Sequence, residues 1–253
     1  MANLLIDIGN TALKAAWADG ITLGRTFRYQ GEKMIDFILS LTSREKPETM
    51  VLSSVRRFNN HDIAALTASC EGLVILDESV YARYSVPSYI TADRAASIIA
   101  SRYLFSNRGC TIIDFGTMLA TDYLDKNGNY EGGCISPGLV TRFKSVNRYS
   151  RNLPLLEIPE ETCDKGLSLS SSIESGVVSG IIFEIEGRIC QNPENIVVFT
   201  GGDANYFAKR MKSSIFVVCN LVSCGDSYST HSFIECRSLS HHVSYSVNRI
   251  WRI

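Results

Sequence analysis

The stretch that decides the fold is NLLIDIGNTALKAAWADG, residues 3–20. Its apolar start predicts a buried strand over 3–8, and a second strand over 12–18 follows a short polar turn. Asp7 stands where the first strand ends. A carboxylate at the edge of a core is costly unless something pairs with it, so we expect Asp7 to serve a bound group.

A second stretch repeats this pattern. TIIDFGTMLATDYLDKNG, from Thr111 onward, also runs from strand through Asp-x-Gly and a Thr-containing turn into a second strand. Asp7 and Asp114 therefore begin matching units, which predicts two related halves, 1–107 and 108–222. Residues 223–253 form a Ser-rich tail without sustained periodicity, where we expect poor structure and no site.

Between the hairpins the pattern is mixed α/β. Further strands are predicted near 50–55, 72–77, 110–114, 118–124, 195–199 and 215–218. Helices are predicted around 34–41, 63–66, 93–105 and 203–213. The clearest helix lies near 171–190, where apolar residues recur every fourth position as one stripe.

Composition excludes several classes of protein. With 25 basic and 26 acidic residues, no global field recruits nucleic acid or an acidic membrane. No apolar run predicts a membrane span, and Asp7 interrupts the place of a signal peptide's apolar stretch, so we expect a cytoplasmic protein. The eight cysteines contain no C-x-x-C pair, which predicts reduced, mostly buried thiols.

Each hairpin places a carboxylate, backbone N–H groups and a hydroxyl at one turn. Such a turn can hold phosphate oxygens, and its aspartate can bind a hard cation that screens them. FTGGDA at 199–204 joins a strand to a helix, where paired glycines either form a simple turn or admit a phosphate. No Walker loop, G-x-G-x-x-G or H-E-x-x-H occurs, which disfavours P-loop, dinucleotide and zinc-protease sites.

YITADRAASIIASRYLF, residues 89–105, places Asp93 and Arg94 in the first turn of a helix that Thr91 can cap. The helix dipole alone would account for the aspartate. Alternatively, the carboxylate orients a substrate hydroxyl and the guanidinium binds an acid group. In phosphoryl transfer positioning matters more than base strength, so a low aspartate pKa is compatible with this role.

Taken in order, these motifs resemble the type III pantothenate kinases, of the acetate kinase, sugar kinase, Hsp70 and actin superfamily. The matching motifs are D-I-G-N-T at 7–11, Tyr84 to Pro87, A-D-R at 92–94, D-F-G-T at 114–117, GNYEGGCISPG at 128–138, L-P at 153–154, S-G at 175–176 and T-G-G at 200–202. The resemblance implies two actin-like (ribonuclease H-like) halves, each a mixed sheet flanked by helices, with a nucleotide cleft between them.

The resemblance also implies a reaction, the ATP-dependent phosphorylation of pantothenate to 4'-phosphopantothenate, which is the first step of coenzyme A biosynthesis. ATP, Mg²⁺ and a monovalent cation, K⁺ or NH4⁺, would be the cofactors, and a homodimer would hold the substrate pocket at its interface. The residues implied for ATP and its phosphates are Asp7, Ile8, Gly9, Asn10, Thr11, Ala12, Leu13, Lys14, Thr117, Gly201 and Gly202. Those implied for pantothenate are Tyr84, Thr91, Ala92, Asp93, Arg94 and Leu169, with Asp93 as the base. Asp114 would hold the monovalent cation, and Asp7 would hold Mg²⁺ through water.

Three positions depart from the family pattern. Thr91 stands where glycine is usual, Ala120 where a second hairpin threonine is usual, and Leu169 where a threonine contacts pantothenate. Two alternatives therefore accompany the kinase: a catalytically degenerate homologue that binds nucleotide as a regulator, and a kinase of another small hydroxylated substrate.

Overall fold

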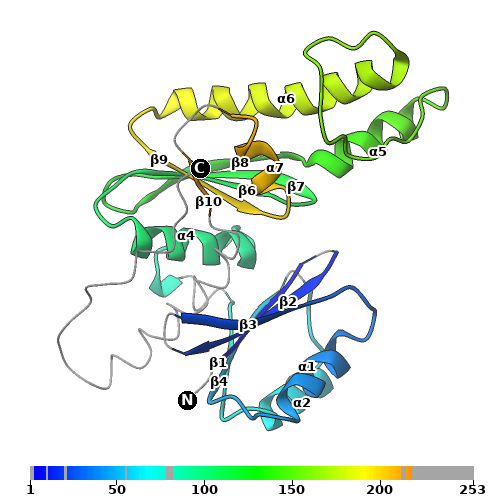
Figure 1. The fold of residues 1–253 in the computed structure, drawn as a ribbon. Coiled ribbons are helices and arrows are strands. Elements are labelled where there is room, and N and C mark those ends of the chain that lie inside the picture. Colours follow the sequence, from blue (N-terminus) through cyan, green and yellow to red (C-terminus); the bar gives the residue numbers. More distant parts are fainter. Residues whose placement is uncertain are drawn as a thin grey trace. The chain divides into compact units, whose positions relative to one another are not determined.

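A computed structural model describes residues 3–9, 11–19, 22–54, 56–77, 82–211 and 215–217. The tail predicted over 223–253 lies outside the described residues. Contacts divide the described chain into two compact units, 3–104 and 105–217 (Figure 1). No helix in the described ranges is both long enough and apolar enough to cross a bilayer.

The first unit is built on a five-stranded mixed sheet. Its strands are β1 (Asn3–Ile8), β2 (Leu13–Asp19), β3 (Thr22–Tyr29), β4 (Thr49–Ser54) and β5 (Gly72–Ile75), in the order β3-β2-β1-β4-β5. The first three form an antiparallel meander, while β4 and β5 run parallel to β1. The helices described in this unit are α1 (Met34–Thr42), α2 (Asn60–Ala68) and α4 (Ala92–Leu104).

Alternation along β1 assigns its side chains to two faces. Leu4, Ile6 and Ile8 join one core cluster with Met34 and Ile38 of α1, and Leu66 of α2 belongs to it as well. Figure 1 shows α1 and α2 together beneath this sheet. Leu5 and Asp7 therefore point to the opposite face, and α4 contacts β4 beside them.

The second unit repeats the topology of the first. Its strands are β6 (Cys110–Phe115), β7 (Met118–Leu124), β8 (Tyr130–Pro137), β9 (Ile196–Gly201) and β10 (Ile215–Val217), in the order β10-β9-β6-β7-β8. Again a meander of three strands is extended by two parallel strands. Its helices are α5 (Leu139–Tyr149), α6 (Leu169–Gln191) and α7 (Ala204–Ala208). The predicted fold class, two related halves that each contain a mixed sheet flanked by helices, is confirmed.

The helical stripe predicted near 171–190 is confirmed. Val177, Ile181 and Ile185 of α6 are buried against Ile113 and Phe115 of β6 in one core cluster. A capping box begins the helix, in which Ser168 Oγ accepts from the N–H of Ser171 and Ser171 Oγ accepts from the N–H of Ser168.

Some elements differ from the sequence prediction. β3, β8 and α5 were not predicted, and the helix expected over 203–213 spans only Ala204–Ala208 among the described residues. β8 contains two glycines and alternates between half-buried and exposed positions, so it lacks a strong apolar signal. After α7, the N–H of Arg210 donates to the carbonyl of Phe207, three residues back. This tighter hydrogen-bond pattern ends the α-helix.

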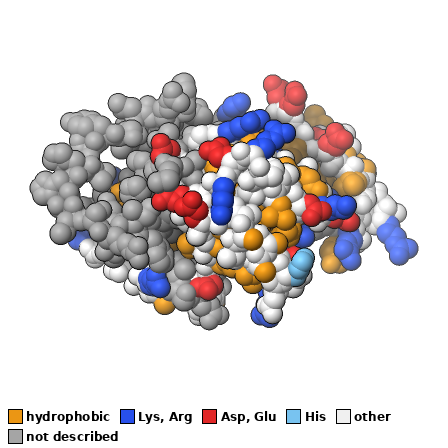
Figure 2. Space-filling view, turned by 90° about the horizontal axis from the view of Figure 1, so that it is seen from below, with side chains coloured by type: hydrophobic (Ala, Val, Ile, Leu, Met, Phe, Trp, Pro, Cys, Tyr) orange, Lys and Arg blue, Asp and Glu red, His pale blue; other side chains and the backbone are white. Residues whose placement is uncertain are grey.

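The thiol prediction is partly wrong. Five cysteines lie in the described ranges, and all five are free. Cys70 and Cys110 are buried, but Cys163 and Cys190 are exposed, because the first lies in a loop and the second on the outer side of α6. On the face in Figure 2, acidic and basic side chains are interspersed among the described residues.

Candidate active site

Asp7 occupies the second-last position of β1. The register places it beside Lys14 on β2 and Ser53 on β4. Its side chain is on the sheet face that α4 contacts, and the residue is only 9% exposed. The fold thus holds a carboxylate inside the first unit, as the sequence predicted for a group at the edge of the core.

The charge on Asp7 is unfavourable in the protein alone. Burial is the largest effect and raises the pKa of Asp7 from 3.8 to about 6. Lys14 lowers this pKa, the negative charge of Asp93 raises it, and the Ser53 hydroxyl lowers it slightly. Asp7 and Asp93 are 86 positions apart in the chain, yet their carboxyl groups interact.

Asp93 lies in the first turn of α4. One of its carboxylate oxygens accepts a hydrogen bond of 2.9 Å from the backbone N–H of Arg94. Arg94 is buried, with 7% of its surface exposed, and Ala92 is buried as well, while Thr91 is exposed. Asp93 itself is half-buried.

The rest of the first hairpin divides into backbone and side-chain contributors. Ile8 and Leu13 are core residues, so they can offer a ligand only their main chain. The N–H of Gly9 donates to the carbonyl of Ala12 at 3.1 Å and closes the turn. Thr11 and Lys14 are exposed at this turn, and Asn10 lies outside the described residues.

In the second unit, Asp114 occupies the position equivalent to Asp7. It is the second-last residue of β6 and pairs with Ala120 on β7 and Thr200 on β9. Gly201 has a φ of +92°, and a Cβ atom there would lie 2.4 Å from Oδ1 of Asp114. Only glycine fits such a position. The turn formed by Gly201 and the exposed Gly202 therefore packs directly against the Asp114 carboxylate.

The motif GNYEGGCISPG supports the second hairpin. A Cβ atom at Gly138 would lie 2.1 Å from the carbonyl oxygen of Gly116, so this glycine permits close packing on the turn. The carbonyl of Thr117 accepts hydrogen bonds from the N–H of Gly138 at 3.0 Å and from Oγ1 of Thr141 at 2.6 Å. Sequence reasoning missed Thr141. The signal was its position three residues after Pro-Gly, where it lies in the first turn of α5.

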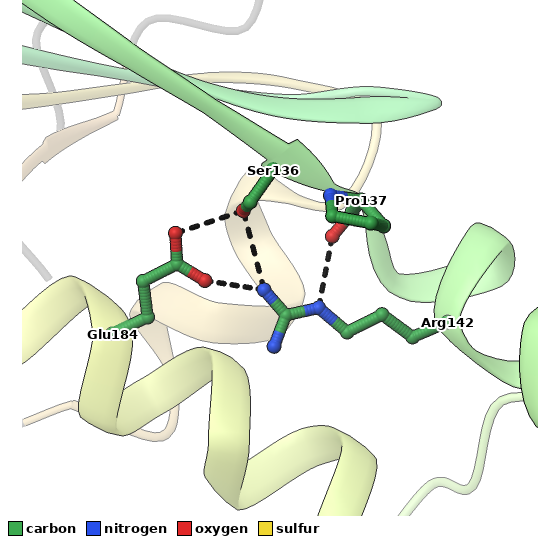
Figure 3. A network of polar contacts seen from close by, with 4 residues as sticks. All are labelled: Ser136, Pro137, Arg142 and Glu184. Carbon is green, nitrogen blue, oxygen red and sulfur yellow. Dashed lines mark hydrogen bonds and ion pairs between the residues drawn. The ribbon is translucent and has the colours of Figure 1, made fainter.

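A polar network joins β8 to α5 and α6 (Figure 3). Nε of Arg142 donates to the carbonyl of Pro137 at 2.9 Å, and Nη2 donates to Oγ of Ser136 at 3.2 Å and to Glu184. Oγ of Ser136 donates to Oε1 of Glu184 at 2.8 Å. The network borders a cavity of about 410 Å³ between the two helices, lined by Pro137, Arg142, Ser145, Val146, Ser172, Ile173, Gly176 and Val177.

Two predicted substrate residues lie on different units. Tyr84 is half-buried in the segment before α4, in the first unit, where Asp93 and Arg94 also lie. Leu169 is the first residue of α6 in the second unit, and it is 55% exposed. The structure thus brings Asp7 and Asp93 together in one unit and Asp114 and Gly201 together in the other.

Several solved structures resemble this chain in fold. The activator of 2-hydroxyisocaproyl-CoA dehydratase from Clostridium difficile, determined with bound ADPNP, is 14% identical and has a TM-score of 0.56, covering 97% of this chain and 100% of its own. An archaeal actin homologue is 11% identical with a TM-score of 0.52, covering 92% and 100%. The chain therefore shares the fold of these two proteins.

Sequence comparison narrows this class. Residues 3–191 match the family described as Type III pantothenate kinase. A type III pantothenate kinase from Flavobacterium psychrophilum is 34% identical, covering 87% of this chain and 94% of its own. The one from Cytophaga hutchinsonii is 35% identical with the same coverage. This chain belongs to the type III pantothenate kinase family.

Proposed function

We infer that this protein is a pantothenate kinase, which transfers a phosphoryl group from ATP to pantothenate in the first step of coenzyme A biosynthesis. Membership of the family over residues 3–191 supports this function. The observation that carries it is that α4, which begins with the proposed base Asp93, contacts β4, the strand that pairs with Asp7 of the proposed phosphate hairpin.

Asp93 is the proposed base. Its carboxylate would orient the pantothenate hydroxyl toward the terminal phosphate of ATP and accept the hydroxyl proton. The backbone N–H of Arg94 holds one carboxylate oxygen at 2.9 Å, which limits rotation of the acid. Arg94 and Tyr84 are proposed to bind the pantothenate molecule, and the hairpin from Asp7 to Lys14 is proposed to bind the phosphates, as are Thr117, Gly201 and Gly202.

The donor set fits a hydrated Mg²⁺ ion. The described residues contain no cluster of three or more His, Cys, Asp or Glu side chains suited to a metal. Mg²⁺ bound to ATP needs only one or two carboxylates besides phosphate and water, which Asp7 can provide. This ion would neutralise phosphate charge. Asp114, beside the Phe115 carbonyl at the Gly201 turn, is proposed to hold K⁺ or NH4⁺.

We also propose that the enzyme is a cytoplasmic homodimer whose pantothenate pocket lies at the subunit interface. Free thiols at all five described cysteines are compatible with a reducing compartment. Exposed apolar side chains on α6, Phe183 at 68% and Leu169 at 55%, are compatible with a protein interface on this helix. Light scattering of the purified protein would give its mass.

The deciding experiment is ADP release by the purified protein with ATP, Mg²⁺ and K⁺, with and without pantothenate. We expect release that depends on pantothenate. ATP binding without any release would favour the degenerate regulator. Release with another hydroxylated compound, such as a sugar or polyol, but not with pantothenate would favour a kinase of different specificity.

A further inference from the structure

The segment just before α4 has an unusual backbone. Ser85, next to Tyr84, has a φ of +51°, a left-handed conformation that residues with a Cβ atom adopt at a cost. The N–H of Ser85 donates to the carbonyl of Ala82 at 3.2 Å and closes a turn around this point. Something outside the turn must stabilise this conformation.

Arg102, in the last turn of α4, makes the compensating contacts. Its Nη1 donates to the carbonyl of Tyr84, and its Nη2 makes a longer bond of 3.5 Å to the carbonyl of Ser85. One guanidinium therefore holds two consecutive carbonyls. Lysine cannot fully reproduce this, because its three N–H donors are on one nitrogen and do not form the planar fork of a guanidinium.

The same helix carries the proposed base. Asp93 and Arg94 lie in its first turn, nine and eight residues before Arg102. A helix rises 1.5 Å per residue, so Asp93 and Arg102 are about 14 Å apart along the axis of one rigid element. The helix thus carries the proposed base Asp93 at its start. Through Arg102 near its end, it also holds the Tyr84 backbone in a fixed position relative to that base.

We propose that Arg102 is a positioning residue that sets affinity for the acid substrate by holding the Tyr84–Ser85 backbone in its left-handed turn. The inference rests on the proposed function, in which Tyr84 binds pantothenate. It assigns no chemical role to Arg102. Its loss is expected to weaken pantothenate binding and to leave phosphoryl transfer and ATP binding intact.

Steady-state kinetics separate this role from a general structural one. We expect Arg102→Met to raise KM for pantothenate about tenfold, the equivalent of one lost charge-assisted hydrogen bond. Both kcat and KM for ATP should stay near the wild-type values. Arg102→Lys should have a KM for pantothenate between those of the wild type and Arg102→Met. Arg44→Met, at an exposed arginine after α1, is the control for loss of one positive charge. It should leave kcat and both KM values unchanged.

A second substitution tests the reason for the contact. Glycine adopts a positive φ without the Cβ cost, so Ser85→Gly added to Arg102→Met should recover part of the lost affinity. Parallel changes in kcat and in both KM values, or no recovery in the double variant, would overturn the proposal.

Amide hydrogen exchange gives a reading that does not depend on turnover. We expect Arg102→Met to speed exchange in peptides covering 82–90 and to leave peptides from β4 unchanged. Unchanged exchange in 82–90 would overturn the proposal even if the wild-type enzyme is active. If wild-type protein releases no ADP with pantothenate, the proposed function fails, and exchange still decides whether Arg102 holds this segment.

Discussion

Gly201 leaves no room for a side chain beside Asp114, since a Cβ atom there would lie 2.4 Å from Oδ1 of Asp114 and 2.5 Å from the carbonyl oxygen of Phe115. Gly201→Ala should displace the carboxylate and strain the backbone at its φ of +92°. We expect a loss of about 1–3 kcal/mol in the free energy of unfolding. The rise in KM for ATP should exceed that for pantothenate. Chemical denaturation measures the change in the free energy of unfolding, and steady-state kinetics measure the two KM values.

Gly187→Ala in α6 is the matched control. Nothing lies within 4 Å of a Cβ atom at this position, and alanine favours the helix by about 0.5–1 kcal/mol. The variant should be as stable as the wild type or more so. Equal destabilisation by both substitutions would contradict the steric argument for Gly201.

Asp7→Asn should stabilise the ligand-free protein. Well below pH 3.8 the carboxyl is protonated in both folded and unfolded chains, so its ionisation does not lower the free energy of unfolding. As pH rises to about 6, the folded chain keeps a proton that the unfolded chain has lost, so the free energy of unfolding falls. The full cost, at most about 3 kcal/mol, is present above that pH.

The pH dependence of this gain is the diagnostic reading. By urea denaturation, the advantage of Asp7→Asn should be largest near pH 8 and about half as large at pH 5. Activity should be lost over the same range, because the substituted amide carries no charge for Mg²⁺. A stability gain that is equal at both pH values would contradict the proposed burial cost.

Asp93→Asn should lower kcat by about 10²–10⁴-fold, the usual contribution of a positioned base. The fold should persist, because removal of the Asp93 charge relieves its repulsion of Asp7. Asp62→Asn, in the first turn of α2, is the control and should keep full turnover. Full turnover of Asp93→Asn with unchanged melting would show that the catalytic assignment is wrong.

The described cysteines should differ in reactivity. Burial raises the pKa of Cys110 to about 12 and also raises that of Cys70, so both stay protonated at neutral pH. Cys163 and Cys190 are exposed and should react first with a thiol reagent. Peptide mapping by mass spectrometry gives the order, and early labelling of Cys110 in folded protein would contradict it.

Thr141→Val tests the support of the second hairpin. The substitution removes the 2.6 Å hydrogen bond to the Thr117 carbonyl and keeps a similar shape. A neutral hydrogen bond contributes about 1 kcal/mol, so we expect KM for ATP to rise a few-fold with little change in KM for pantothenate. Thr67→Val, which removes a hydroxyl-to-carbonyl bond to Ile63 within α2, should leave kinetics unchanged.

Much of the fold was accessible from the sequence because two D-x-G hairpins repeat one pattern. Asp7 and Asp114 follow apolar strands in the same way, and both become second-last residues of matching strands. The α6 helix was clear because its apolar stripe is long. β8 and α5 were not, since the first is rich in glycine at the sheet edge and the second is mostly polar.

The contacts that shape the candidate site were harder to predict because they join distant parts of the chain. The influence of Asp93 on Asp7 depends on α4 contacting β4. The left-handed Ser85 and its bond to Arg102 have no sequence signature, because neither is a glycine or a capping motif. Pairing across a fold is decided by packing, which local propensity does not encode.

The length of α6 has a consequence for how the protein melts. Its 23 residues extend over about 35 Å, whereas the six residues of β9 beneath it span about 20 Å. Much of the helix therefore lies beyond its own sheet, as Figure 1 shows, and Phe183 remains exposed on it. If a second copy covers this helix, folding is coupled to association. The midpoint of thermal unfolding should then rise with protein concentration.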